Sequence, residues 1–181
     1  DARALTSLRQ SLNALHEAIS DFGERLSARE MSASATADVI HLVQIQETSA
    51  ALARRLATLV ETWVKHEPRG PTQQVALRWI EALDVLLGET LTALAGHDSQ
   101  HLAILREMTG NQGPQVEDMR RRYLDAGERF TVQERKLLLT TLGKIEGCIW
   151  LLHRLCRAGI REFKAAESGC ASQSRPGGCR T

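Results

Sequence analysis

The chain has 181 residues, of which 43% are hydrophobic, 25% charged and only 4% aromatic, and its formal net charge is +1. This length suits one domain, or two small repeats, with a real core. A strand-rich sandwich or barrel is not expected, because such folds use aromatic residues heavily. The small charge gives no long-range attraction for nucleic acid, and no apolar run reaches the ~18 residues needed to span a membrane.

The first third of the chain shows apolar residues three and four positions apart, the spacing that predicts amphipathic helices. A first helix is expected at 5–26 and a second at about 36–66. Between them lies a small polar linker in which Ser32, Ser34 and Thr36 are candidate N-caps. One apolar stripe runs along the first helix, formed by Leu5, Leu8, Leu12, Leu15, Ile19, Phe22 and Leu26.

Loop signals divide the middle of the chain. The stretch HEPRGP ends the second helix, because proline cannot continue the backbone hydrogen-bond ladder, and Pro71 can then open a third. Gly96 can close that helix. Asp98 or Ser99 can cap a short fourth helix at about 99–109.

Two more helices are expected in the last third. Pro114 opens a mostly polar helix that runs to about 129. Thr131 and Glu134 then form a capping box, in which the Thr oxygen and the Glu carboxylate satisfy free backbone N–H groups reciprocally. The final helix therefore begins there and runs to about 166.

The pattern as a whole predicts an all-α fold, because no strand-like alternation is found. Short loops between the helices favour an antiparallel helical bundle. The bundle is expected over 1–167, with a first group at about 1–67 and a second at about 71–167. Residues 168–181 lack periodicity and are expected to form a flexible tail.

The stretch KIEGCIWLLHRLCRAGI, residues 144–160, raises the strongest question of chemistry, because Cys148, His153 and Cys156 lie close together in it. On a helix, only His153 and Cys156 share a face. A structural zinc ion needs four convergent ligands. The two thiols are about 12 Å apart along the helix, too far for a disulfide. We therefore interpret this stretch as the packed core of the last helix.

The other cysteines and the N-terminus bear on the compartment. Cys170 and Cys179 lie in the tail, where exposed free thiols are a simpler interpretation than a pair. The N-terminus lacks the layout of a signal peptide, and the cysteine usage fits a reducing compartment. A cytoplasmic location is therefore expected.

The remaining candidate side chains are interpreted structurally. His97 and His101 are four residues apart, but Gly96 places His97 outside a helix, so a solvated loop and helix start are expected. The three tryptophans lie on or beside apolar stripes, which predicts that they pack in the core or between helices: Trp63, Trp79 and Trp150.

Patterns that mark an enzyme are not recognisable in the chain. We find no nucleophile with a positioned base, no Gly-rich phosphate loop after a strand and no inward pair of carboxylates. The protein is therefore not expected to be an enzyme, and no catalytic, cofactor-binding or metal-binding residue is assigned.

Three amphipathic stretches share a pattern with one known family. They are LNALHEAISDFGERLS at 12–27, ADVIHLVQIQETSAALARRLATLVE at 37–61, and VEDMRRRYLDAGERF followed by LLLTTLGKIEGCIWLLHRL. These stretches resemble helices of the PhoU-like domain, the cytoplasmic C-terminal half of bacterial sodium/phosphate cotransporter-type proteins. The resemblance covers about residues 10–160. It implies two three-helix groups, with the first incomplete because the family has a further helix before Leu5.

The chain departs from this family where the family binds metal. Metal-binding PhoU proteins use Glu/Asp-x-x-x-Asp motifs, and the matching positions here are Gln46 and Ala50, and Gly143 and Gly147. None of these pairs can ligate a cation, so metal binding is not implied. An incomplete first group would leave an uncovered apolar groove, to be filled by a partner or a second copy.

The resemblance implies a non-enzymatic regulatory domain linked to sodium-coupled phosphate transport or phosphate homeostasis. Such a domain would dock to a protein partner, a membrane transporter half or a second copy, at the inner face of the membrane. The alternative is a coiled-coil-like assembly, chaperone or secretion-effector bundle, in which the 5–26 stripe pairs with another helix. A weaker alternative is an enzyme or sensor with a ligand in the bundle core.

Overall fold

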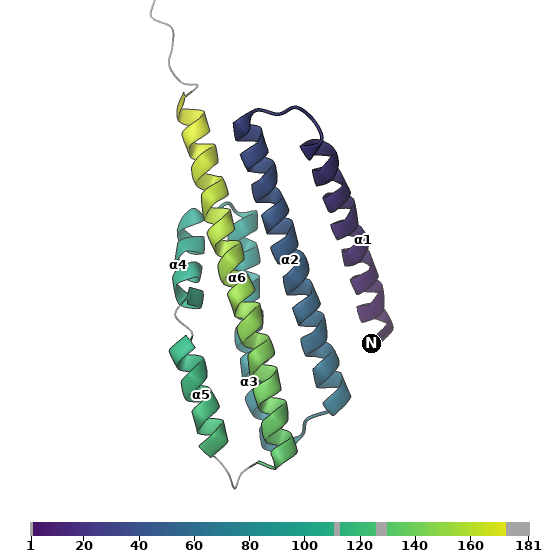
Figure 1. Cartoon of the computed structure of the whole chain (residues 1–181). Helices are drawn as coiled ribbons and strands as arrows, with labels where there is room; N and C mark the ends of the chain where they lie inside the picture. The colour runs from purple at the N-terminus through teal and green to yellow at the C-terminus, as the bar shows by residue number, and fades with distance from the viewer. Residues whose placement is uncertain (1, 111–112, 126–129, 173–181) are drawn as a thin grey trace, which may run out of the picture.

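The computed structural model describes residues 2–110, 113–125 and 130–172, and the regular secondary structure in these ranges is entirely α-helical. The prediction of an all-α fold is therefore confirmed. Six helices follow one another in this part of the chain (Figure 1): α1 (Ala2–Ser27), α2 (Ala33–His66), α3 (Gly70–Ala95), α4 (Ser99–Gly110), α5 (Gly113–Asp125) and α6 (Val132–Ser172).

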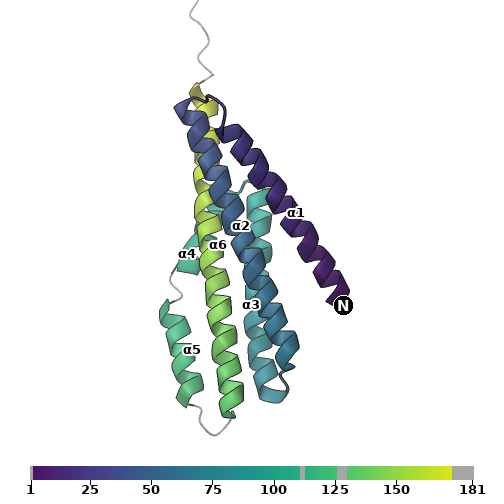
Figure 2. The same ribbon diagram turned by 45° about the vertical axis from the view of Figure 1, so that its right-hand side comes forward.

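The last helix, α6, is the centre of the arrangement and packs against α2, α3, α4 and α5. Figure 1 shows α4 and α5 along one side of α6 and α2 along the other, with α3 behind. Among the helices as described, α1 packs against α2 alone. Toward its N-terminus α1 diverges from the rest of the bundle (Figure 2). The first helix is thus attached to the outside of the bundle.

The main core lies where α2, α3 and α6 meet. Its buried residues include Leu52 and Leu59 from α2, Leu83 from α3, and Cys148 and Leu152 from α6. Because apolar burial drives folding at roughly 25 cal/mol per Å², this cluster holds the three helices together. The two predicted groups, 1–67 and 71–167, therefore share one core through the contact between α2 and α6.

The predicted helix starts match the structure closely. Ser32 is the N-cap of α2, and its Oγ accepts a hydrogen bond from the backbone N–H of Ala35 at 3.2 Å. Pro71 lies in the first turn of α3. Asp98 caps α4, where its carboxylate accepts a bond from the backbone N–H of His101 at 2.8 Å. Each cap satisfies an N–H group that the helix itself leaves free.

The capping box at the start of α6 is confirmed in both directions. The backbone N–H of Thr131 donates to Glu134 Oε2 at 2.8 Å, and the backbone N–H of Glu134 donates to Thr131 Oγ1 at 3.2 Å. The hydroxyl of Thr72 on α3 also donates to Glu134, at 3.1 Å. These bonds lower the pKa of the Glu134 carboxyl, the backbone bond from Thr131 most of all.

The final helix is longer than predicted. It continues to Ser172 rather than ending near 166, so the first residues of the expected tail, 168–172, are helical. Residues 173–181, which include Cys179, lie outside the described residues. The predicted end of the fifth helix near 129 also lies outside them, because the description of α5 ends at Asp125.

Candidate functional site

The structure separates the three suspected ligands of the last helix. Cys148 and Cys156 are free and fully buried, which confirms their predicted place in the core. His153 is half-buried on another face of α6, where its Nδ1 lies 3.0 Å from the backbone carbonyl of Arg106 and 3.3 Å from Thr109 Oγ1. The histidine therefore joins α6 to α4 and does not meet the thiols.

Both buried thiols are poor nucleophiles. Burial raises the pKa of Cys148 from 9.0 to about 11, and the positive charge of Arg55 offsets part of this rise. Burial also raises the pKa of Cys156, against a hydrogen-bond contact of 3.9 Å with the hydroxyl of Thr90. Since the thiolate is the reactive form, neither residue is set up for catalysis or redox exchange near neutral pH.

The other histidine candidates also stay apart. His97 lies between α3 and α4 with a positive φ of 53°, so it is outside both helices as predicted. His101 Nε2 lies 3.3 Å from Glu89 on α3. Across the part of the chain that the structure describes, no three His, Cys, Asp or Glu side chains come together in a way that could hold a metal ion.

The tryptophans divide into two kinds. Trp63 and Trp79 are partly buried against the core clusters, as predicted. Trp150 is 57% exposed, so the prediction of a core or interface position is wrong for this residue. Helical geometry explains the difference: the core-facing side of α6 carries Ile149 and Leu152, and the ring at 150 points well away from it. Its ring instead stacks under the guanidinium of Arg154, 5.0 Å from the ring centroid.

The apolar stripe of α1 is largely uncovered, although stripes of this kind normally face a core. Four large side chains of the stripe are 36–62% exposed: Leu12, Leu15, Ile19 and Phe22. The side chains of Leu5 and Leu8 lie outside the description. An apolar stripe of this length on a helix that touches one neighbour is the most unusual surface feature of the molecule.

The contact between α1 and α2 uses a different side of α1. Arg9 pairs with Glu61 at 2.6 Å, and Gln46 donates to the backbone carbonyl of His16 at 3.1 Å. Gly23 packs against Val43. The three α1 positions are seven residues apart and so lie on one face, next to the stripe. One flank of the apolar stripe of α1 therefore packs on α2, while the stripe itself remains exposed.

Helix α2 extends this apolar surface. Leu42 and Val60 are eighteen residues apart, which is five helical turns, and Val64 lies one turn further on. All three are exposed. Because α1 and α2 run antiparallel, helical geometry places them on the same side of the helix pair as the α1 stripe. We call the combined surface the α1–α2 face: Leu12, Leu15, Ile19, Phe22, Leu42, Val60 and Val64.

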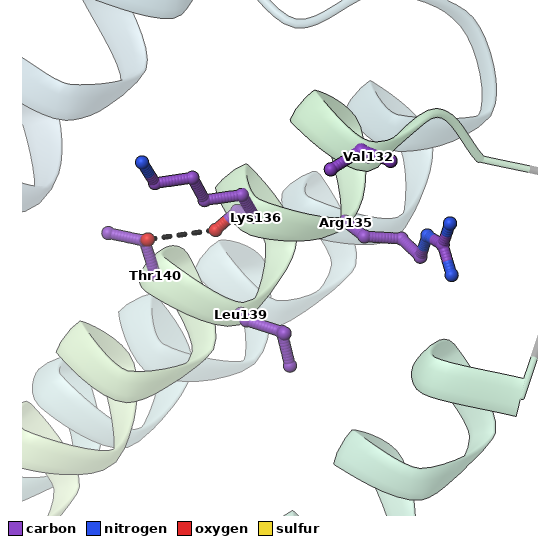
Figure 3. Close-up of a pocket in the computed structure, with 5 residues that line it drawn as sticks. All are labelled: Val132, Arg135, Lys136, Leu139 and Thr140. Carbon is purple, nitrogen blue, oxygen red and sulfur yellow. Dashed lines mark hydrogen bonds between the residues drawn. The ribbon is translucent and has the colours of Figure 1, made fainter.

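Two hollows lie near the start of α6. One, of about 570 Å³, is lined by Val132, Arg135, Lys136, Leu139 and Thr140 (Figure 3). The other, of about 500 Å³, lies between the loop that joins α2 to α3 and the first turns of α6, with Arg69, Thr72 and Glu134 among its lining residues. Neither holds a nucleophile positioned beside a base.

One contact that sequence reasoning missed joins α2 to α6. The guanidinium of Arg55 lies against Gly147, closely enough that a Cβ at this position would overlap it. The absence of a side chain at Gly147 leaves room for this cationic group. No signal in the sequence pairs Arg55 with Gly147, since ninety-two residues separate them and neither belongs to a motif.

Membrane insertion and known relatives complete the description. No described helix is both long and apolar enough to cross a lipid bilayer. No family model, curated protein or solved structure matches the chain. The function must therefore be argued from the surfaces of the molecule.

Proposed function

We propose that the protein is a helical assembly module whose α1–α2 face pairs with the same face of a second copy. The observation that carries this proposal is the exposure of the α1 stripe: Leu15 and Phe22 are 55% and 62% exposed on one line of a regular heptad. A heptad seam of this kind is buried in known coiled coils by a facing helix. Burial of the α1 stripe against a partner would be favourable, and the single chain does not gain this free energy.

The size of the face agrees with a stable pair. A helix of 26 residues is about 39 Å long, and two packed helices are about 20 Å wide. The face therefore covers roughly 800 Å², which is what each partner buries in an interface of standard size. A partner that offered one short segment would leave much of this surface uncovered.

The flank of the stripe also suits a second copy. Ser11 and Ala18 lie beside the seam on the side away from α2, and both are small, uncharged and exposed. Two α1 helices can therefore approach closely without like charges meeting at these positions. A copy of the chain brings a seam of matching length and chemistry, which an isologous contact requires.

The resemblance to PhoU-like domains adds a further hypothesis about context. It implies that the assembled module regulates phosphate transport by docking to a membrane transporter half, at the cytoplasmic face of the membrane. The proposal of self-association does not depend on a role in phosphate transport. The phosphate-linked role stays a prediction, and a defect in phosphate uptake in cells that lack the protein would test it.

The oligomeric state in solution tests the proposal. We expect the purified chain to sediment as a dimer that dissociates on dilution, and the double variant Leu15→Glu/Phe22→Glu to be monomeric. Because both side chains are exposed, the helical circular dichroism should be unchanged. Val85→Glu on α3 is the matched control, since Val85 is 63% exposed and lies outside the face. A monomeric wild-type chain would refute self-association, and a dimeric double variant would refute the α1–α2 face as the interface.

A further inference from the structure

The outward side of α6 carries a second apolar stripe. The positions Val132, Leu139, Gly143, Gly147 and Trp150 follow one another at steps of seven, four, four and three, so they lie along one side of the helix. Val132 is 69% exposed and Trp150 57%. Leu139, Gly143 and Gly147 are half-buried between these two exposed ends.

The middle of the stripe is shaped by glycine. A Cβ built at Gly143 meets no atom within 4 Å, so the space above this residue is open. At Gly147 the Arg55 side chain fills the place of a Cβ and carries its charge onto the stripe. Small residues at the centre of a helix face let another backbone approach closely. The stripe is therefore low at Gly143, whereas Arg55 fills the space at Gly147.

Basic side chains outnumber acidic ones along α6 itself. Between Val132 and Ile160 the chain has five basic and two acidic residues. Both acids are already engaged, since Glu134 accepts bonds from Thr131 and Thr72, and Glu146 pairs with Arg120 at 2.5 Å. Lys136 and Arg154 are exposed on the stripe itself. A partner with carboxylates along its edges would complement these charges.

The lower end of the stripe offers a specific anchor point. A shallow depression of about 570 Å³ is lined here by residues of α6 alone, and Figure 3 shows their side chains spreading to both flanks of the helix. Arg135 also lines it, and its Nε is a buried donor without a hydrogen-bond partner among the described residues. A buried donor left unpaired costs free energy. An apolar side chain of a partner helix would lie against Val132 and Leu139 at this end of the stripe.

From these features we infer that the outward side of α6 docks an acidic amphipathic helix of another protein. The stripe is straight and about 27 Å long from Val132 to Trp150, which matches the helix-in-groove mode of recognition. A nucleic acid would need its phosphates contacted along the whole surface, whereas Lys136, Arg55 and Arg154 are separated here by apolar side chains and glycine. The site is independent of the α1–α2 face, because α6 does not pack against α1 in the described structure.

The test uses a fluorescein-labelled helical peptide of about 20 residues, with Leu and Ala on one face and Glu along both edges. A second peptide carries Lys in place of every Glu. Fluorescence anisotropy should show the acidic peptide binding at least about tenfold more tightly than the basic one. The double variant Lys136→Glu/Arg154→Glu should remove this preference. Equal binding of the two peptides, or no binding of either, would refute the inference.

A glycine pair supplies the matched control. Gly143→Leu should fill the low centre of the stripe and weaken binding of the acidic peptide about tenfold or more, with unchanged circular dichroism. Gly88→Leu on α3 adds the same side chain in equally open space and should leave binding unchanged. If Gly143→Leu and wild type bound the acidic peptide equally, the stripe on α6 would not be the binding site. A different outcome is that neither peptide binds, while the chain binds phosphatidylserine vesicles and Gly143→Leu abolishes that binding. This outcome would overturn the choice of partner.

Discussion

Arg55 on α2 lies with its guanidinium against Gly147 on α6, in the space that a Cβ of any other residue would need. The same charge acts on the buried thiol of the next residue, Cys148. The Arg55 side chain is largely exposed, and its positive charge reaches this thiol from the surface of the helix pair.

Removing this charge should raise the pKa of Cys148 above its present value of about 11, because the positive guanidinium favours the thiolate. We expect Arg55→Ala to slow alkylation of Cys148 by iodoacetamide at alkaline pH. The measurement needs a background in which Cys148 is the only thiol, made with Cys156→Ala, Cys170→Ser and Cys179→Ser. Arg54→Ala is the control, since it removes a neighbouring arginine that lacks this contact. If the two variants slowed alkylation equally, the effect could not be assigned to the charge of Arg55.

Stability should fall at alkaline pH through the same thiol. The pKa of Cys148 is about 11 in the folded chain and 9.0 when unperturbed, so the unfolded state loses its proton first as the pH rises. The stabilisation that the protonated Cys148 thiol gives the folded state is fully present below pH 9. Roughly 2 kcal/mol of the free energy of unfolding is lost as the pH rises to about 11. Urea unfolding of wild type and Cys148→Ala should show a smaller alkaline loss in the variant. Parallel pH profiles would contradict this prediction.

The capping box should contribute measurably to the start of α6. Replacing the Thr131 hydroxyl by a methyl group in Thr131→Val leaves the backbone N–H of Glu134 without its 3.2 Å partner. We expect the free energy of unfolding to fall by about 1 kcal/mol. Thr140→Val is the control, because Thr140 is exposed and only bonds the carbonyl of Lys136 within the same helix. An equal loss in both variants would show that the cap has no special role.

The end of α2 offers a stabilising substitution. Glu67 is the C-cap residue and has a left-handed backbone, with φ 39° and ψ 58°. Glycine adopts this conformation without steric cost, and the ion pair of Glu67 with Arg69 is 3.9 Å long and exposed, so its loss matters little. Glu67→Gly should raise the free energy of unfolding by about 1 kcal/mol. An unchanged or lower melting temperature would contradict this expectation.

Local features of this chain were predictable because their causes lie within a few residues of sequence. Ser32, Asp98 and the pair Thr131 and Glu134 cap helices where their side-chain oxygens accept bonds from free N–H groups three positions away. The burial of Cys148 and Cys156 also follows from local sequence, since both lie on the wide apolar side of one long helix. The length of α6 was underestimated because its last turns lack apolar periodicity.

The candidate surfaces depend on contacts between residues far apart in the chain. The 5–26 stripe and the stripe that includes Leu138, Leu142 and Leu152 have similar spacing. Only the second is buried, because α6 has helices on several sides whereas α1 has one neighbour. Likewise, Trp150 resembles a core residue in sequence but is 57% exposed, with Arg154 over its ring.

The sequence by itself therefore determined an all-α chain, the starts of its helices, and a last helix with thiols turned inward. These properties follow from hydrogen bonding and periodicity over one or two turns. The tertiary structure decided which apolar stripes are covered and which stay open for a partner. Periodicity shows that a helix has an apolar side, but the packing of all the helices together determines what that side contacts.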